Sequence, residues 1–133
     1  MAPLAAAERA TAFLLEEKEA LAREITRRLY ADMPELLERY GERGRAKCLQ
    51  DMRYNLEHLA PAVELERPEM FGAYVRWLDG LLRAHGVATA EVVRTLELME
   101  EVLDERLPAD EAQAVRECVR AGLAVVREGG EGG

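Results

Sequence analysis

The fold is decided by one stretch, Arg43-Gly-Arg-Ala-Lys-Cys-Leu-Gln-Asp-Met-Arg-Tyr-Asn-Leu-Glu-His-Leu-Ala-Pro-Ala-Val63. Its apolar side chains recur at spacings of four, four, three and four residues: Cys48, Met52, Leu56, Leu59 and Val63. A helix turns such a stripe toward a protein core. Asp51, Asn55 and His58 run beside it at spacings of four and three, so three hydrogen-bonding side chains share a second face of this helix. Because this polar row lies next to a buried stripe, we expect its three side chains to have a binding partner inside the fold.

Upstream of this stretch the sequence predicts more helix. Residues 3–32 favour one long helix or two short ones, and Pro34 can open a short helical segment that ends at Tyr40. Gly41 and Gly44 then mark the turn into the central helix, which we expect from about residue 45 onward.

Downstream, three further helices are expected, beginning at Pro68, at Thr89 and at Pro108. The helix from Pro68 has the strongest helical periodicity in the chain and is expected to end at Gly86. No segment alternates between apolar and polar residues with a period of two. The predicted fold class is therefore all-α, a globular bundle of crossed helices.

Length and charge limit the possible functions. The 133 residues predict a single domain over residues 1–128, followed by a disordered Gly-rich tail over residues 129–133. A formal net charge of −8 repels phosphate backbones and anionic lipids, so neither nucleic acid nor a membrane is an expected partner. The chain carries two cysteines and shows no signal-peptide pattern, so we expect a cytoplasmic protein with reduced thiols.

The motifs of common enzymes and metal sites are missing from the sequence. It contains no Gly-rich phosphate loop, no Cys/His pattern spaced for zinc, and no evident nucleophile and base pair. We therefore expect a non-enzymatic protein without a metal site.

One segment carries a family resemblance. Arg45-Ala-Lys-Cys-Leu-Gln-Asp-Met52, continued by Tyr54-Asn-Leu-Glu57, resembles the part of phycobiliproteins that attaches a linear tetrapyrrole, or bilin. There a cysteine is followed three residues later by an aspartate and then by an aromatic and leucine-rich stretch. Leu29-Tyr-Ala-Asp-Met-Pro-Glu-Leu36 is similar to the family's approach to that helix, and the order of helices and turns matches over residues 20–127. The resemblance implies a globin-like bundle with a pocket beside the central helix.

The sequence also departs from phycobiliproteins. We expect it to lack the N-terminal helical pair with which those proteins assemble their light-harvesting discs. Gln50 stands where the family commonly has an arginine that holds a bilin propionate. In both respects the chain is similar in type to simpler bacterial relatives, the bilin biosynthesis-associated globins.

The resemblance implies roles for the charged residues. Cys48 would attach a bilin as its thiolate, with Lys47 and Arg45 expected to lower the thiol pKa. Asp51, one turn further on, would bind the pyrrole N–H groups. Arg43 and Arg45, together with Arg53, are candidates for the bilin propionates because a guanidinium matches a carboxylate in a two-pronged geometry.

The resemblance also implies roles for the remaining polar and aromatic side chains. Asn55 or His58 would reach a ring carbonyl, and the side walls of the pocket would be aromatic. The candidates for these walls are Tyr54, Tyr74 and Trp77.

Other interpretations stay open from the sequence. Cys48 also fits a small core residue, and Asp51 also fits a surface residue paired with Arg53 or Lys47. A second hypothesis is a ligand-free interaction or signalling module that acts as a dimer, and a third is a haem-binding globin with His58 as the iron ligand. We expect a homodimer with Trp77 near its interface, and bilin-pathway or signalling proteins as possible partners.

Overall fold

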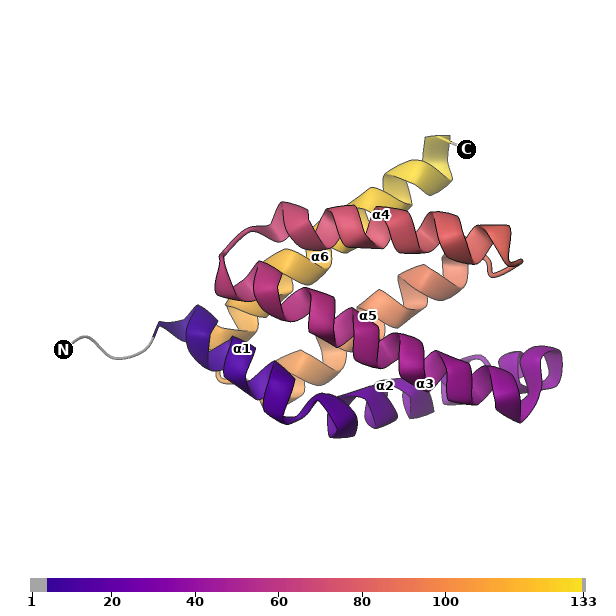
Figure 1. The fold of residues 1–133 in the computed structure, drawn as a ribbon, viewed down its shortest axis with the longest axis horizontal. Coiled ribbons are helices and arrows are strands. Elements are labelled where there is room, and N and C mark those ends of the chain that lie inside the picture. Colours follow the sequence, from indigo (N-terminus) through magenta and orange to yellow (C-terminus); the bar gives the residue numbers. More distant parts are fainter. Residues whose placement is uncertain (1–4, 133) are drawn as a thin grey trace.

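The computed structural model of the protein describes residues 5–132. Over these residues the backbone forms six helices and no strand, so the predicted all-α class is confirmed (Figure 1). The helices are α1 (Ala6–Glu16), α2 (Lys18–Asp32), α3 (Glu35–Glu64), α4 (Pro68–Ala84), α5 (Thr89–Arg106) and α6 (Ala109–Gly132). None of them combines the length and apolar character that a membrane crossing requires.

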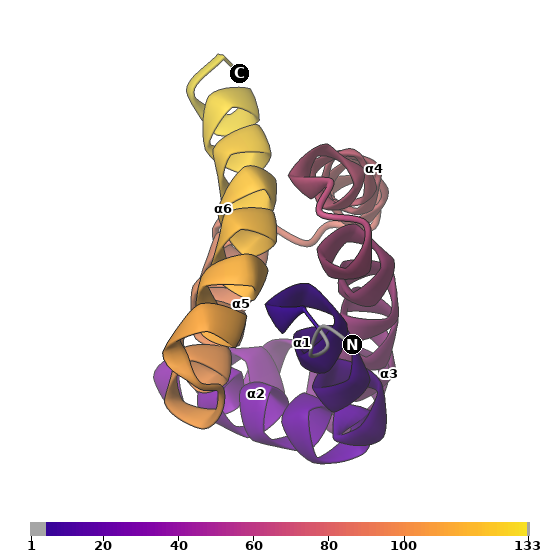
Figure 2. The ribbon, with the colours of Figure 1, turned by 90° about the vertical axis from the view of Figure 1, so that its left-hand side faces the viewer.

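The N-terminal helical region consists of two helices, which is one of the two arrangements that the sequence predicted for residues 3–32. Glu17 leaves helical geometry with φ −101° and ψ 12°, so the chain turns between α1 and α2. Before this turn, α1 packs on α3 and α6; after it, α2 packs on α3 and α5 (Figure 2).

Helix α3 carries the stretch that decides the fold. Pro34 precedes its first residue, and Gly41 interrupts it with φ 69° and ψ −171°, a left-handed conformation that glycine adopts without a steric penalty. Residues 35–40 therefore form a separate short segment, as predicted, and the helix resumes directly after Gly41. Pro61 lies inside the last turns, also as predicted.

A single hydrophobic core draws on all six helices. The stripe on α3 contributes to it through Met52, Leu56, Leu59 and Val63, each at most 1% exposed. Cys48, at the start of the stripe, is only partly buried because it lies at the edge of this core.

The position of α4 determines where the site lies. Helix α4 packs most extensively on α6, where Gly122 lets Phe71 and Val75 approach the α6 backbone closely. Its contacts with α5 are much fewer. The space between α3, α4 and α5 is therefore not closed by backbone packing.

The last helix extends into the Gly-rich C-terminal segment. The backbone of α6 is helical through Gly132. Gly133 lies outside the described residues.

Candidate functional site

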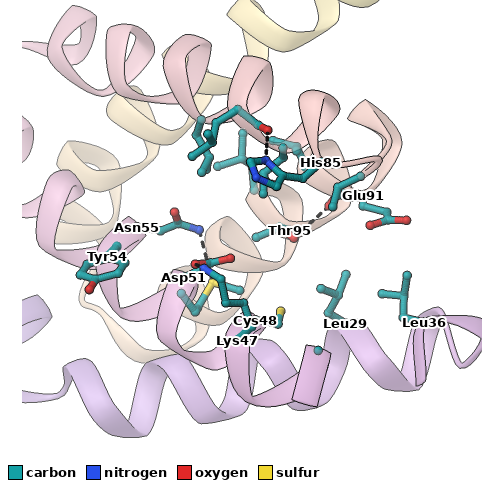
Figure 3. Close-up of a pocket in the computed structure, with 18 of the residues that line it drawn as sticks. Leu29, Leu36, Lys47, Cys48, Asp51, Tyr54, Asn55, His85, Glu91 and Thr95 are labelled. Atoms are coloured by element: carbon teal, nitrogen blue, oxygen red, sulfur yellow. Dashed lines mark hydrogen bonds and ion pairs between the residues drawn. The ribbon is translucent and has the colours of Figure 1, made fainter. Parts of the chain in front are cut away.

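A pocket of about 950 Å³ opens beside the central helix (Figure 3). Its walls come from α2, α3, α4 and α5, and most of the side chains are aliphatic or aromatic. Pockets of this size and character typically hold small organic ligands and cofactors. The space lies where the family resemblance placed it, next to Cys48 and Asp51, both of which line it.

The polar row of α3 faces this pocket, and each of its members has a partner. Asp51 accepts a hydrogen bond from Lys47 Nζ at 3.1 Å. Asn55 is only 4% exposed, and its Oδ1 accepts a hydrogen bond from the Tyr74 hydroxyl at 2.7 Å. The ring of His58 stacks on the ring of Tyr74 with a centroid distance of 4.1 Å. Asn55 and His58 thus join α3 to α4 at one wall of the pocket.

Cys48 lines the pocket, but its electrostatic surroundings differ from the prediction. Burial and the neighbouring carboxylate of Asp51 raise the pKa of the thiol to about 11. Arg45 does lower the thiol pKa, but burial and Asp51 outweigh it. Lys47 pairs with Asp51, and the guanidinium of Arg45 lies over the Tyr30 ring, 5.5 Å from its centroid. The predicted activation of this thiol is therefore wrong.

The arginines predicted to hold propionates do not line the pocket. Arg43 is exposed, and Arg45 is held against Tyr30. Arg53 points to another part of the surface, where its Nε and Nη2 donate to the two carboxylate oxygens of Glu19 at 2.7 and 2.8 Å. Lys47 is the one lysine or arginine among the residues described as lining the pocket.

Glu91 is a pocket residue that sequence reasoning missed. It lies on α5, is only 7% exposed, and accepts hydrogen bonds at Oε1 from Arg39 Nη1 at 3.2 Å and from the Tyr40 hydroxyl at 3.5 Å. Burial raises the pKa of this carboxyl group. A sequence signal existed, because Glu91 and Thr95 continue the inward face of α5 toward Leu98 at spacings of four and three.

Aromatic side chains form part of the pocket wall and its rim. Tyr74 lies within the wall, whereas Trp77 and Tyr54 remain 61% and 45% exposed beside the opening. Trp77 and Tyr74 have a centroid distance of 6.1 Å. Together they offer a flat ligand an aromatic surface on α4.

Two histidines line the pocket. His58 Nδ1 lies 2.9 Å from the carbonyl oxygen of Tyr54, and His85 Nδ1 lies 2.9 Å from that of Leu81. The Nε2 atom of each ring has no hydrogen-bond partner among residues 5–128. The described residues contain no group of three or more His, Cys, Asp or Glu side chains able to hold a metal ion.

A comparison with protein families identifies the chain. A family model for phycobilisome proteins matches residues 4–121, a span that includes every helix lining the pocket. No curated protein sequence matches the chain. Since the family match covers most of the chain and the fold is entirely helical over the described residues, the protein belongs to the phycobilisome protein family and has its globin-like phycobiliprotein fold.

Proposed function

We propose that the protein is a non-enzymatic carrier or sensor that binds a linear tetrapyrrole in the pocket beside α3. Phycobilisome proteins carry bilin chromophores. The observation that carries the proposal is the open pocket of about 950 Å³ that both Cys48 and Asp51 line. A cytoplasmic location, in which both thiols stay reduced, is part of the same proposal.

The character of the pocket supports a bilin. Apolar walls favour the burial of a conjugated ring system, and the carboxylate of Asp51 provides a hydrogen-bond acceptor for pyrrole N–H groups. A ligand-free interaction module requires side chains to fill this space, whereas the pocket is open.

The thiol pKa bears on how the ligand is held. With a pKa of about 11, roughly one Cys48 side chain in ten thousand is ionised at pH 7. The thiolate is the nucleophile, so unassisted addition to a bilin side chain is slow. The proposed complex is therefore non-covalent in the first instance, with attachment through Cys48 as a later and slower step.

Co-expression with a bilin-producing pathway tests the proposal. The purified protein is expected to show a visible absorption band that Cys48→Ala retains, because the walls and Asp51 hold the ligand without the thiol. On a denaturing gel stained with zinc, covalent pigment would fluoresce for the wild type and not for Cys48→Ala. Cys118→Ala is the matched control, since this second thiol lies in the core and outside this pocket.

Titration of the purified protein provides an independent measurement. Trp77 is the only tryptophan of the chain and lines the pocket, so a bound bilin should quench its fluorescence. The absence of both a visible band and quenching by biliverdin would overturn the proposed function.

Haem is a second candidate ligand, and the histidine geometry favours it. A metal-binding histidine commonly has its other ring nitrogen bonded to a backbone carbonyl, as His58 and His85 both do. His58 stacks on Tyr74, which precedes His85 by eleven residues or about 16 Å of helix, so the two histidines are too far apart to bind one iron. A Soret band on mixing with haemin, lost in His58→Ala, would support haem ligation.

We also propose that the protein forms a homodimer. Phycobiliproteins typically form oligomers. Trp77 and Leu81 on α4 are 61% and 41% exposed, and a second copy covering this face would remove both from water. Sedimentation of the wild type and of Leu81→Glu tests this, and a monomeric wild type at micromolar concentration would contradict the proposal.

A further inference from the structure

Two carboxylates, from different helices, line the pocket. Asp51 comes from the middle of α3 and Glu91 from the first turn of α5. Figure 3 shows both residues at the same pocket, Asp51 on α3 and Glu91 on α5. Carboxylates in apolar surroundings are costly unless both of their oxygens have hydrogen-bond partners.

Over residues 5–128, the protein donates hydrogen bonds to only one oxygen of each carboxylate. Lys47 donates to Asp51 Oδ1, while Arg39 and Tyr40 both donate to Glu91 Oε1. Among residues 5–128, no group donates to Asp51 Oδ2 or to Glu91 Oε2. Glu91 lines the pocket, and its Oε2 is not among the fully buried atoms that lack a partner. The pocket thus contains two unused acceptors.

The pocket offers little to an acidic group. Lys47 is the one lysine or arginine among the described residues that line it, and it already pairs with Asp51. Arg39, which approaches Glu91, is likewise paired. A ligand carboxylate placed between Asp51 and Glu91 would meet two acidic side chains and no unpaired lysine or arginine among the described lining residues.

We infer that the pocket selects a ligand with two separate N–H donors, one for Asp51 Oδ2 and one for Glu91 Oε2, and leaves the ligand's acidic groups outside. The inference rests on the proposed function and narrows it: the buried part of the ligand is the N–H-bearing pyrrole chain, and its propionates contribute nothing to affinity. Glu91 is then a specificity-determining residue that α5 contributes to the pocket.

The test compares two ligands that differ only in whether their two propionic acid groups are free or esterified. Biliverdin and its dimethyl ester are titrated against the wild-type protein at pH 8, with quenching of Trp77 fluorescence as the signal. We expect the ester to bind as tightly as the free acid or more tightly. If the acid binds more than about tenfold tighter, acid recognition exists and the inference is wrong, although the proposed function stands.

Variants test the two acceptors separately. Glu91→Gln and Asp51→Asn are each expected to weaken both ligands by about tenfold, because an amide presents N–H groups where the carboxylate presented an acceptor. Glu8→Gln makes the same change on the exposed surface of α1, away from the pocket, and should leave binding unchanged. Circular dichroism confirms that each variant is folded.

The outcomes distinguish the two proposals. If folded Glu91→Gln binds biliverdin and its ester as tightly as the wild type does, Glu91 does not contact the ligand and the inference is wrong. If neither biliverdin nor its ester quenches Trp77, and co-expression with a bilin pathway gives no visible band, the proposed function fails together with the inference. The comparison of the two ligands in the wild type does not depend on whether any variant folds.

Discussion

The close contact between α4 and α6 at Gly122 gives the sharpest prediction from the packing. A Cβ atom at Gly122 would lie 2.8 Å from Val75 Cγ2 and 3.1 Å from Phe71 Cδ2 and Cε2. Phe71 and Val75 are both fully buried, so neither can swing out to relieve the overlap. Gly122→Ala must therefore displace α4 or α6, and overpacking of this kind costs about 1–3 kcal/mol.

A matched substitution isolates that cost. Gly80 lies in α4 with nothing within 4 Å of the position where a Cβ would stand. Gly80→Ala gains helix propensity of about 1 kcal/mol and pays nothing in packing. Because Gly122→Ala gains a similar amount, the difference in unfolding free energy between the two variants reports the overpacking alone.

Thermal unfolding followed by far-UV circular dichroism provides the measurement. For a chain of this size, 1 kcal/mol corresponds to a change in Tm of about 4 °C, so Gly122→Ala should melt about 4–12 °C below Gly80→Ala. Equal Tm values for the two variants would refute the close approach of α4 to α6. Because α4 is a wall of the pocket, we also expect Gly122→Ala to weaken the binding of a bilin, and Gly80→Ala to leave it unchanged.

Three further predictions concern single groups. At pH 7, Cys48 should react with iodoacetamide about a hundredfold more slowly than a thiol with the ordinary pKa of 9.0. Its reaction rate should rise tenfold per pH unit toward pH 11, and a plateau of the rate below pH 9 would contradict the raised pKa. Arg53 lowers the pKa of Glu19 from 4.5 to about 2, so the stability that this pair adds above pH 4.5 should be lost as the pH falls toward 2. In Glu19→Gln, Tm should therefore fall less over this pH range than in the wild type. Tyr74→Phe removes the hydrogen bond to Asn55 and should cost about 0.5–1.5 kcal/mol in urea unfolding, with no effect expected if the two side chains do not meet.

The bound protein and the free protein should also differ in stability. A ligand that binds only the folded state raises the unfolding free energy, and with it Tm, by an amount that grows with the logarithm of the ligand concentration above Kd. Biliverdin at a hundred times its Kd should add about 2.7 kcal/mol to the unfolding free energy, measured by thermal unfolding at fixed protein concentration. Asp51→Asn should show a smaller increase than the wild type at the same ligand concentration.

The sequence by itself determined the helices and their breaks, because these depend on local properties. The spacing of the apolar residues in α3, the left-handed turn at Gly41, and the prolines just before α3 and at the first position of α4 act over a few residues. The polar row of Asp51 and Asn55 beside the core stripe was equally readable, since positions four residues apart share a face of a helix.

Only the tertiary structure decided what those residues do. Arg45 lies three residues from Cys48, yet Tyr30 on α2 holds its guanidinium, and the thiol pKa follows burial instead of the neighbouring positive charges. Glu91 reaches the pocket because α4 packs on α6 and leaves α5 uncovered there. Periodicity specifies which face of a helix is apolar, but cavities, pairings and pKa values depend on distances between helices that are far apart in the chain.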